Sequence, residues 1–239
     1  MNTYLSSAQL KDKAKYKLTG HYGLLIGISL LVGLISFFVS IILLLVVPST
    51  TFVGTVISEC ISFIISVFIG VFFVGTYLIY LKLASGNTAT LTDLFYGFSH
   101  NIQRSLAISL VLNAVSIIPT LAYIIPYQFF LQTRQDIYLY LMFPCLAIAL
   151  VVFVPLYLGL SQCYYLMLDF PSKSASDILT LSFNVMKGHK ARLFYIEISF
   201  IPLVLLGIIS GLGMLWITPY MRMTMTNFFF DIMKTEQKY

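Results

Sequence analysis

Long runs of apolar residues dominate this sequence and leave few folds open to it. Hydrophobic residues make up 59% of the 239 positions and charged residues only 10%, whereas soluble domains carry about 25% charged residues. A run of about 18 apolar residues is long enough to cross a bilayer as a helix. The sequence therefore predicts an all-α, polytopic transmembrane helix bundle that forms a single integral-membrane domain over residues 1–239. The long runs cover residues 22–47, 52–81, 106–131, 137–168 and 193–230.

Three of these runs follow a polar segment that opens with a helix-capping pattern and ends in a histidine. A Ser or Thr with a Gln or Asp three residues later lets side chains and backbone N–H groups satisfy each other where a helix begins. We call these stretches, residues 6–21, 90–100 and 174–189, the launch segments. The pattern predicts three helical hairpins, each preceded by a cytosolic amphipathic helix, in pseudo-repeats over about 1–84, 85–170 and 171–239. The alternative is that any surface helix ahead of a span shares these features. The capping pairs and histidines are Ser6, Gln9 and His21; Thr90, Asp93 and His100; and Ser174, Asp177 and His189.

The last apolar run, residues 193–230, decides between five and six membrane spans. Two spans and a turn need about 40 residues, so a final hairpin turning at residues 211–213 has to be short. Six spans leave Arg134 on the outer side, whereas five spans also place Arg222, Lys234 and Lys238 there. Lys and Arg favour the cytoplasmic face, which predicts six spans with both termini cytoplasmic.

The net charge of +5 reflects basic residues that flank the apolar runs. Lys11, Lys13, Lys15 and Lys17 precede the first span, where they would meet anionic headgroups. Membrane lipids are therefore predicted partners, and nucleic acid is not. A cleaved signal peptide is rejected, because the polar lead and the first apolar run are both too long. The expected location is the cytoplasmic (cell) membrane.

Charges inside predicted spans are functional candidates, because each is costly in lipid unless it is paired. Glu197 and Arg222 lie in the two arms of the last hairpin at depths that a long Arg side chain can bridge. They form a candidate intramembrane ion pair, with a role in carrying a proton or a solute as the alternative. Glu59 lies near the outer end of the second span and reaches interfacial water in the simplest interpretation.

His21, His100 and His189 occupy equivalent positions in the launch segments, and Gly188 precedes the third. We interpret them as interfacial hinges between surface helix and span. Three imidazoles around one axis would resemble a zinc site, but no carboxylate or Cys accompanies them at ligand spacing. No metal or other cofactor is predicted.

Catalytic sequence patterns are missing from the chain. There is no nucleophile elbow, no paired intramembrane aspartate, no HExxH and no Walker loop. We therefore expect a protein that is not an enzyme.

The third launch segment and the run after it carry a family resemblance. The motifs are Met186-Lys187-Gly188, Arg192-Leu193-Phe194, Ile198-Ser199-Phe200-Ile201, Gly211-Leu212-Gly213-Met214-Leu215-Trp216, Pro219-Tyr220 and Phe229-Phe230-Asp231-Ile232. Together, they resemble a bacterial integral-membrane family of unknown function, DUF975. The likeness is densest over about residues 160–232, and Pro202-Leu203 departs from it where the family usually has Gly-Trp. The resemblance implies a multi-pass bacterial membrane protein without assigned catalytic residues. It also implies a distant likeness to the non-catalytic membrane portion of some glycerophosphodiester phosphodiesterases.

Two functional hypotheses follow. The first is a non-enzymatic membrane accessory that binds lipid or another membrane protein, such as an exporter, in export, immunity or envelope processes. The second is a small transporter or flippase that uses Glu197 and Arg222, suggested by the repeat and by prolines inside the third and fourth spans.

Overall fold

The computed structural model describes residues 4–46, 51–100 and 102–236, and this part of the chain is all-α, as predicted. The helices are α1 (Ser7–Leu18), α2 (Tyr22–Val46), α3 (Phe52–Ala84), the 3₁₀ helix η1 (Leu91–Phe95), α4 (Tyr96–Ser99), α5 (Ile102–Thr133), α6 (Ile137–Leu160), α7 (Cys163–Asp169), α8 (Ala175–Val185), α9 (Lys190–Ile198), α10 (Ile201–Ser210) and α11 (Met214–Glu236).

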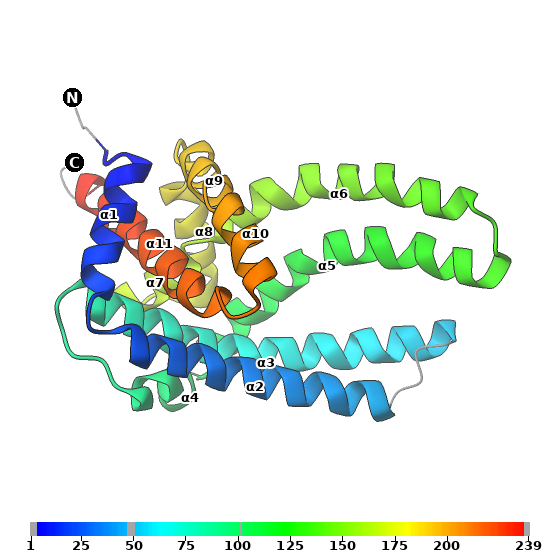
Figure 1. Ribbon diagram of the computed structural model, residues 1–239, viewed down its shortest axis with the longest axis horizontal. Coiled ribbons are helices and arrows are strands. Elements are labelled where there is room, and N and C mark those ends of the chain that lie inside the picture. Colours follow the sequence, from blue (N-terminus) through cyan, green and yellow to red (C-terminus); the bar gives the residue numbers. More distant parts are fainter. Residues whose placement is uncertain (1–3, 47–50, 101, 237–239) are drawn as a thin grey trace.

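Two long hairpins, α2 with α3 and α5 with α6, extend along the longest axis of the molecule (Figure 1). Large apolar side chains cover their outer faces, for example Phe38 on α2 and Phe143 and Val151 on α6, all at least half exposed. Apolar faces of this size are unfavourable in water and are expected to face the lipid chains of a membrane. Five segments of the described residues are long and apolar enough to cross a membrane, which makes this a multi-pass membrane protein. They are Tyr22–Leu43, Phe52–Ala84, Ile102–Thr133, Ile137–Asp169 and Lys190–Ser210.

The stretch predicted as the third hairpin is built differently. Its first arm is divided into α9 and α10, and the chain then turns at Gly211, whose φ of 70° suits glycine. In Figure 1 this turn lies about midway along the long axis, short of the far ends of the other two hairpins. α11 packs against α10 on its return but is not one of the five candidate spans. Within the described ranges, therefore, a sixth span of full length is not seen.

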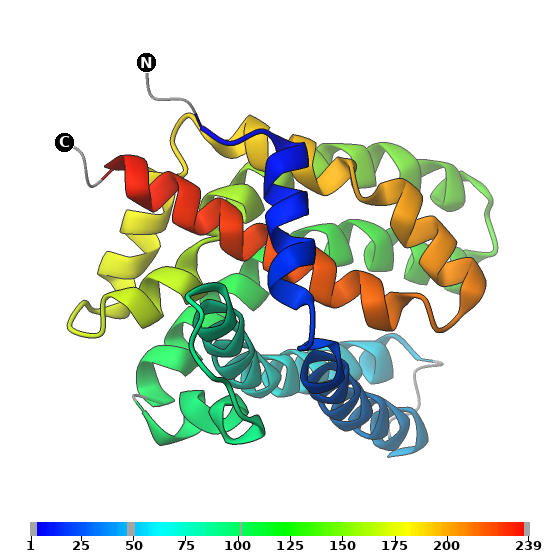
Figure 2. The ribbon, with the colours of Figure 1, turned by 60° about the vertical axis from the view of Figure 1, so that its left-hand side comes forward.

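The C-terminal part of α11 nevertheless returns to the end of the molecule where α1 lies (Figure 1). Figure 2 shows α1 crossing α11, and the side-chain amide of Asn227 donates a hydrogen bond of 3.3 Å to the carbonyl oxygen of Leu10. Burial, followed by the nearby charges of Lys234 and Lys13, lowers the pKa of Lys17 on α1. Lys238 lies outside the described residues.

Each launch segment begins with the predicted capping residues. The Ser6 backbone N–H donates to the side chain of Gln9 at 2.8 Å, and the hydroxyl of Ser6 accepts from the Gln9 backbone N–H at 3.2 Å. The same reciprocal pair joins Ser174 and Asp177 at the start of α8. Thr90 and Asp93 form a capping box too, but it opens the short η1 and α4 in place of a longer amphipathic helix.

The first and third launch segments match in local geometry and in burial. Gly20 and Gly188 precede the following helices with φ of 83° and 86°. At five pairs of equivalent positions both side chains are buried, three of them on the surface helices α1 and α8, so these two helices use a similar face against the bundle. The pairs are Leu10 and Ile178, Ala14 and Ser182, Leu18 and Met186, Leu25 and Leu193, and Ile28 and Ile196.

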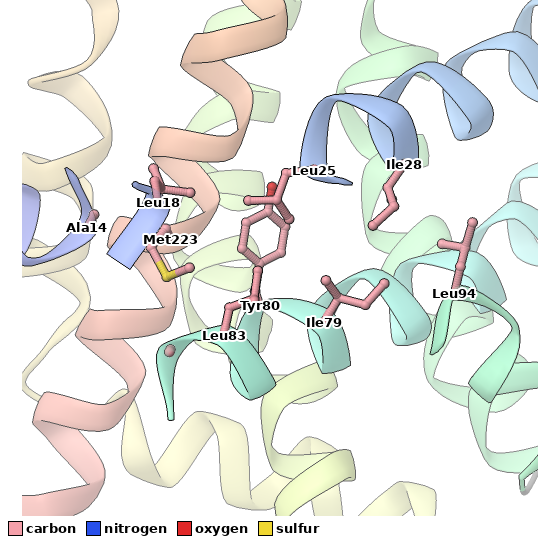
Figure 3. Close-up of a cluster of buried hydrophobic side chains, with 10 residues drawn as sticks. Ala14, Leu18, Leu25, Ile28, Ile79, Tyr80, Leu83, Leu94 and Met223 are labelled. Carbon is pink, nitrogen blue, oxygen red and sulfur yellow. The ribbon is translucent and has the colours of Figure 1, made fainter. Parts of the chain in front are cut away.

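A tight core lies at the α1 end of the molecule. Figure 3 shows Leu18, Leu25, Tyr80 and Met223 pointing toward one another from α1, α2, α3 and α11. Leu94 of η1 closes the cluster, and the backbone around it approaches α3 at Gly75. This core holds α1 and η1 against α2, α3 and α11.

Candidate functional site

A cavity of about 310 Å³ lies among α3, α5, α6, α7, α9 and α11, and we call it the polar cavity. It combines one basic and one acidic side chain with phenol and amide groups. Six residues that define its chemistry are Tyr77, Asn113, Tyr157, Gln162, Glu197 and Arg222.

Arg222 supplies the cation of the polar cavity from α11. Its Nη1 donates a hydrogen bond of 2.7 Å to the hydroxyl of Tyr77, and its guanidinium lies 5.3 Å from the Tyr77 ring centroid and 5.8 Å from that of Phe73. Among the described residues, Tyr77 is the hydrogen-bond acceptor that Arg222 uses. A guanidinium has five N–H donors in a fixed fork, so most of them remain available to a guest in the cavity.

Glu197 supplies the carboxylate from α9. Its Oε1 accepts a hydrogen bond of 3.2 Å from the hydroxyl of Tyr157 on α6. The predicted ion pair with Arg222 is not formed, because the salt bridges within 4.0 Å among the described residues are Lys15–Asp12, Lys82–Asp93 and Arg192–Asp231. The structure brings Glu197 and Arg222 to one cavity but gives each a tyrosine as its direct partner.

Tyrosine rings form one wall of the polar cavity. The Tyr77 ring lies 5.1 Å from the ring of Tyr164 and 4.6 Å from that of Tyr165, measured between centroids. The Tyr165 hydroxyl is hydrogen-bonded to Thr226 of α11 at 2.9 Å. This packing fixes Tyr77, and through it the position of Arg222.

Two helix breaks border the polar cavity, and neither was expected from the sequence. The predicted fourth span, residues 137–168, is interrupted at Ser161 and Gln162, between α6 and α7. Gln162 is 1% exposed, and its side-chain oxygen has no hydrogen-bond partner. A buried, unpaired acceptor is costly, and Gln162 is also one of the residues that line the polar cavity.

The second break separates α9 from α10 at Ser199 and Phe200, just beyond Glu197. Lys11 of α1 donates a hydrogen bond of 3.1 Å to the freed Ser199 carbonyl oxygen and lies 4.2 Å from the Phe200 ring centroid. Pro202 in the first turn of α10 was the available signal, because proline favours the start of a new helix.

A second hollow of about 670 Å³ runs between α3 and α5 toward the far end of the molecule, and we call it the apolar groove. Asn113 and Ser116 line both the polar cavity and the apolar groove, so the two adjoin on α5. Glu59, the charged residue among the described lining residues of the groove, is exposed on α3.

The three histidines lie in separate parts of the structure and do not converge on one site. His21 is exposed before α2, and His100 is exposed, stacked on Tyr96 and hydrogen-bonded to Ser99 at 2.8 Å. His189 follows Gly188 at the start of α9 and lies within 3.3 Å of the Tyr4 hydroxyl. No cluster of three or more His, Cys, Asp or Glu suited to a metal occurs in the described part of the chain.

Comparison with known proteins identifies the family to which the chain belongs. No curated protein and no solved structure matches it. The model of one family does match, over residues 1–236, and it confirms the resemblance seen in the sequence. The chain belongs to the family described as "Protein of unknown function (DUF975)".

Proposed function

We propose that this protein is a non-enzymatic membrane accessory that binds the polar headgroup of an amphipathic lipid in the polar cavity. The observation that carries the proposal is Arg222, a cation set among the membrane helices that faces a cavity and has a phenol as its partner in place of a carboxylate. Cations in that position are costly unless an anion compensates them. A lipid phosphate would supply that anion from the surrounding bilayer.

The proposed orientation places the launch segments on the cytoplasmic side of the membrane. In this arrangement three hairpins enter the membrane from that side, and the third, α9–α10 with α11, is the shortest. The matched caps, glycines and buried positions of the first and third launch segments support a repeat origin. The lysines of α1 support the cytoplasmic assignment through the positive-inside rule.

A flippase or small transporter is the second candidate, favoured by the two helix breaks beside the polar cavity. Broken helices that line a central site are typical of transporters, because the freed backbone groups bind substrate. The two candidates share the same site and differ in whether the lipid moves across the bilayer.

Lipid retention tests the main proposal. The protein is purified in mild detergent from cells, and bound lipid is quantified by native mass spectrometry for wild type, Arg222→Gln and Arg134→Gln. Arg134 makes a matched control because it is exposed in the turn between α5 and α6. We expect wild type and Arg134→Gln to retain a lipid that Arg222→Gln loses. Equal retention by all three would contradict the proposal. Transbilayer movement of a fluorescent lipid in proteoliposomes would then favour the flippase.

A further inference from the structure

The geometry points to a bipartite site for one glycerophospholipid, with a zwitterionic headgroup in the polar cavity and one acyl chain in the apolar groove. This inference rests on the proposed function and goes further by naming the headgroup chemistry and the position of the chain. The occupant is a phospholipid that carries a phosphate and a primary ammonium.

The charges of the polar cavity match such a headgroup. Arg222 offers N–H donors to a phosphate, while the Glu197 carboxylate offers an acceptor to an ammonium. Arg222 and Glu197 each have a tyrosine hydroxyl as direct partner, so a zwitterion would give each of them a charge of opposite sign. A headgroup without an ammonium would leave Glu197 with the Tyr157 hydroxyl as its partner.

Along α3, the proposed headgroup site comes first and the apolar groove follows it, in the same order as the headgroup and the acyl chains of a phospholipid. Tyr77 lies little more than one turn before Lys82, about 7.5 Å along the axis, so the headgroup site is close to the basic end of the molecule. The apolar groove then follows α3 from Ser66 to Phe52, toward the opposite end. A phospholipid in the leaflet beside α1 would therefore have its chains pointing into the groove.

The apolar groove is long enough for one acyl chain. Its lining on α3 from Phe52 to Ser66 covers about 21 Å of helix, which is more than the hydrocarbon thickness of one leaflet, about 15 Å. Gln128 of α5 donates a hydrogen bond of 2.7 Å to Thr55 of α3 at the far end, which ties the two helices together there. Asn113 and Ser116 lie where the headgroup site gives way to the groove.

The test fills the groove without touching the charged residues. Ser62 lines the groove on α3, so Ser62→Trp would place an indole in the path of the chain, and Ser40→Trp on the exposed face of α2 is the matched control. Native mass spectrometry measures retention of phosphatidylethanolamine, phosphatidylglycerol and soluble glycerophosphoethanolamine by wild type, Ser62→Trp, Ser40→Trp and Arg222→Gln. Circular dichroism and thermal melting show whether each variant is folded.

We expect wild type and Ser40→Trp to prefer phosphatidylethanolamine and Ser62→Trp to bind it at least about tenfold more weakly, which is about 1.4 kcal/mol. A phosphatidylethanolamine with a photoreactive acyl chain should cross-link to residues 52–66 in wild type. If Arg222→Gln loses lipid while Ser62→Trp keeps it, the proposed function stands and the groove assignment is overturned. Equal binding of phosphatidylglycerol, or competition by the soluble headgroup at equal concentration, would also overturn the inference. Retention by both variants would overturn the inference and the proposed function together.

Discussion

The guanidinium of Arg222 on α11 donates a hydrogen bond of 2.7 Å to the hydroxyl of Tyr77 on α3. This contact joins the C-terminal helix to a helix more than a hundred positions earlier in the chain, and it orients the cation toward the polar cavity. Since Tyr77 is held by Tyr164 and Tyr165, the cation is pre-positioned for a guest.

Removing the Tyr77 hydroxyl should weaken both stability and lipid retention. Tyr77→Phe deletes the acceptor of Arg222 and keeps the ring, so we expect a loss of about 1 kcal/mol, the usual size of a hydrogen bond between membrane helices. Thermal unfolding in detergent measures it. Tyr123→Phe is the control, because Tyr123 is exposed on α5 and stacks on Tyr127. An unchanged melting temperature and unchanged lipid retention in Tyr77→Phe would refute the role of this contact.

Gly75 should not tolerate a side chain. A Cβ at this position would lie 2.0 Å from the carbonyl oxygen of Leu94, so backbone would have to move. We expect Gly75→Ala to destabilise the protein by about 1–3 kcal/mol, read as a lower melting temperature. Gly27→Ala is the matched control, because its Cβ would meet no heavy atom within 4 Å. Equal melting temperatures for the two variants would show that α3 and η1 are not packed as described.

The ion pair between Arg192 and Asp231 should contribute more than an exposed one. Arg192 also donates to the Leu5 carbonyl oxygen at 2.7 Å, and Asp231 accepts from the Leu5 N–H at 3.1 Å. Asp231→Asn should therefore destabilise the protein by about 2 kcal/mol.

Asp12→Asn is the comparison, because the Asp12–Lys15 pair is 3.9 Å apart and largely exposed. Its loss should change stability by less than about 0.5 kcal/mol. A larger effect of Asp12→Asn than of Asp231→Asn in the same thermal assay would contradict the assignment of Arg192 and Asp231 as a structural node.

Stability should depend on the ionisation of Asp93. Partial burial would raise the pKa of this carboxyl, but the hydrogen bond from Lys82 at 2.6 Å, the bond from the Thr90 N–H and the Lys82 charge outweigh it, so the pKa is lowered. A lowered pKa stabilises the folded state above the unfolded value of about 3.9. That contribution is lost as the pH falls through the folded pKa.

We therefore expect the melting temperature of wild type to fall more than that of Asp93→Asn between neutral pH and about pH 3. Reversible thermal scans over that range give the two slopes. Parallel slopes would show that Asp93 does not contribute.

The orientation of the chain can be read by cysteine labelling. In a background with Cys60, Cys145 and Cys163 replaced by Ala, single cysteines at Lys13, Lys234 and Gln135 report on three exposed positions. We expect Lys13→Cys and Lys234→Cys to react only after the cytoplasmic face is opened, and Gln135→Cys to react in intact cells. Labelling of Lys234→Cys in intact cells would contradict the return of α11.

Local sequence signals predicted the spans and caps well, because they depend on apolar length and on pairs such as Ser6 with Gln9. The geometry of the third hairpin was harder to predict from the sequence. The predicted depths of Glu197 and Arg222 are correct only if both arms run straight from the turn at Gly211 with equal tilt. The break between α9 and α10 means that the first arm is not straight. The missing Glu197–Arg222 ion pair has the same cause, since depth along a straight helix cannot locate a side chain beyond a break.

The polar cavity itself was not predictable from one sequence. Tyr77, Tyr157 and Arg222 come from three helices far apart in the chain, and their contacts depend on helix rotation. Gln162 lies within an apolar run, and its position beside the cavity follows from the helix break between α6 and α7, which the run does not predict.

The most direct test is an experimental structure of the protein in lipid nanodiscs, with a bound antibody fragment to aid alignment. The account predicts elongated density that begins at the guanidinium of Arg222 and continues between α3 and α5 toward Phe52. A closed cavity in which Glu197 and Arg222 pair directly, with no lipid density beside them, would contradict it.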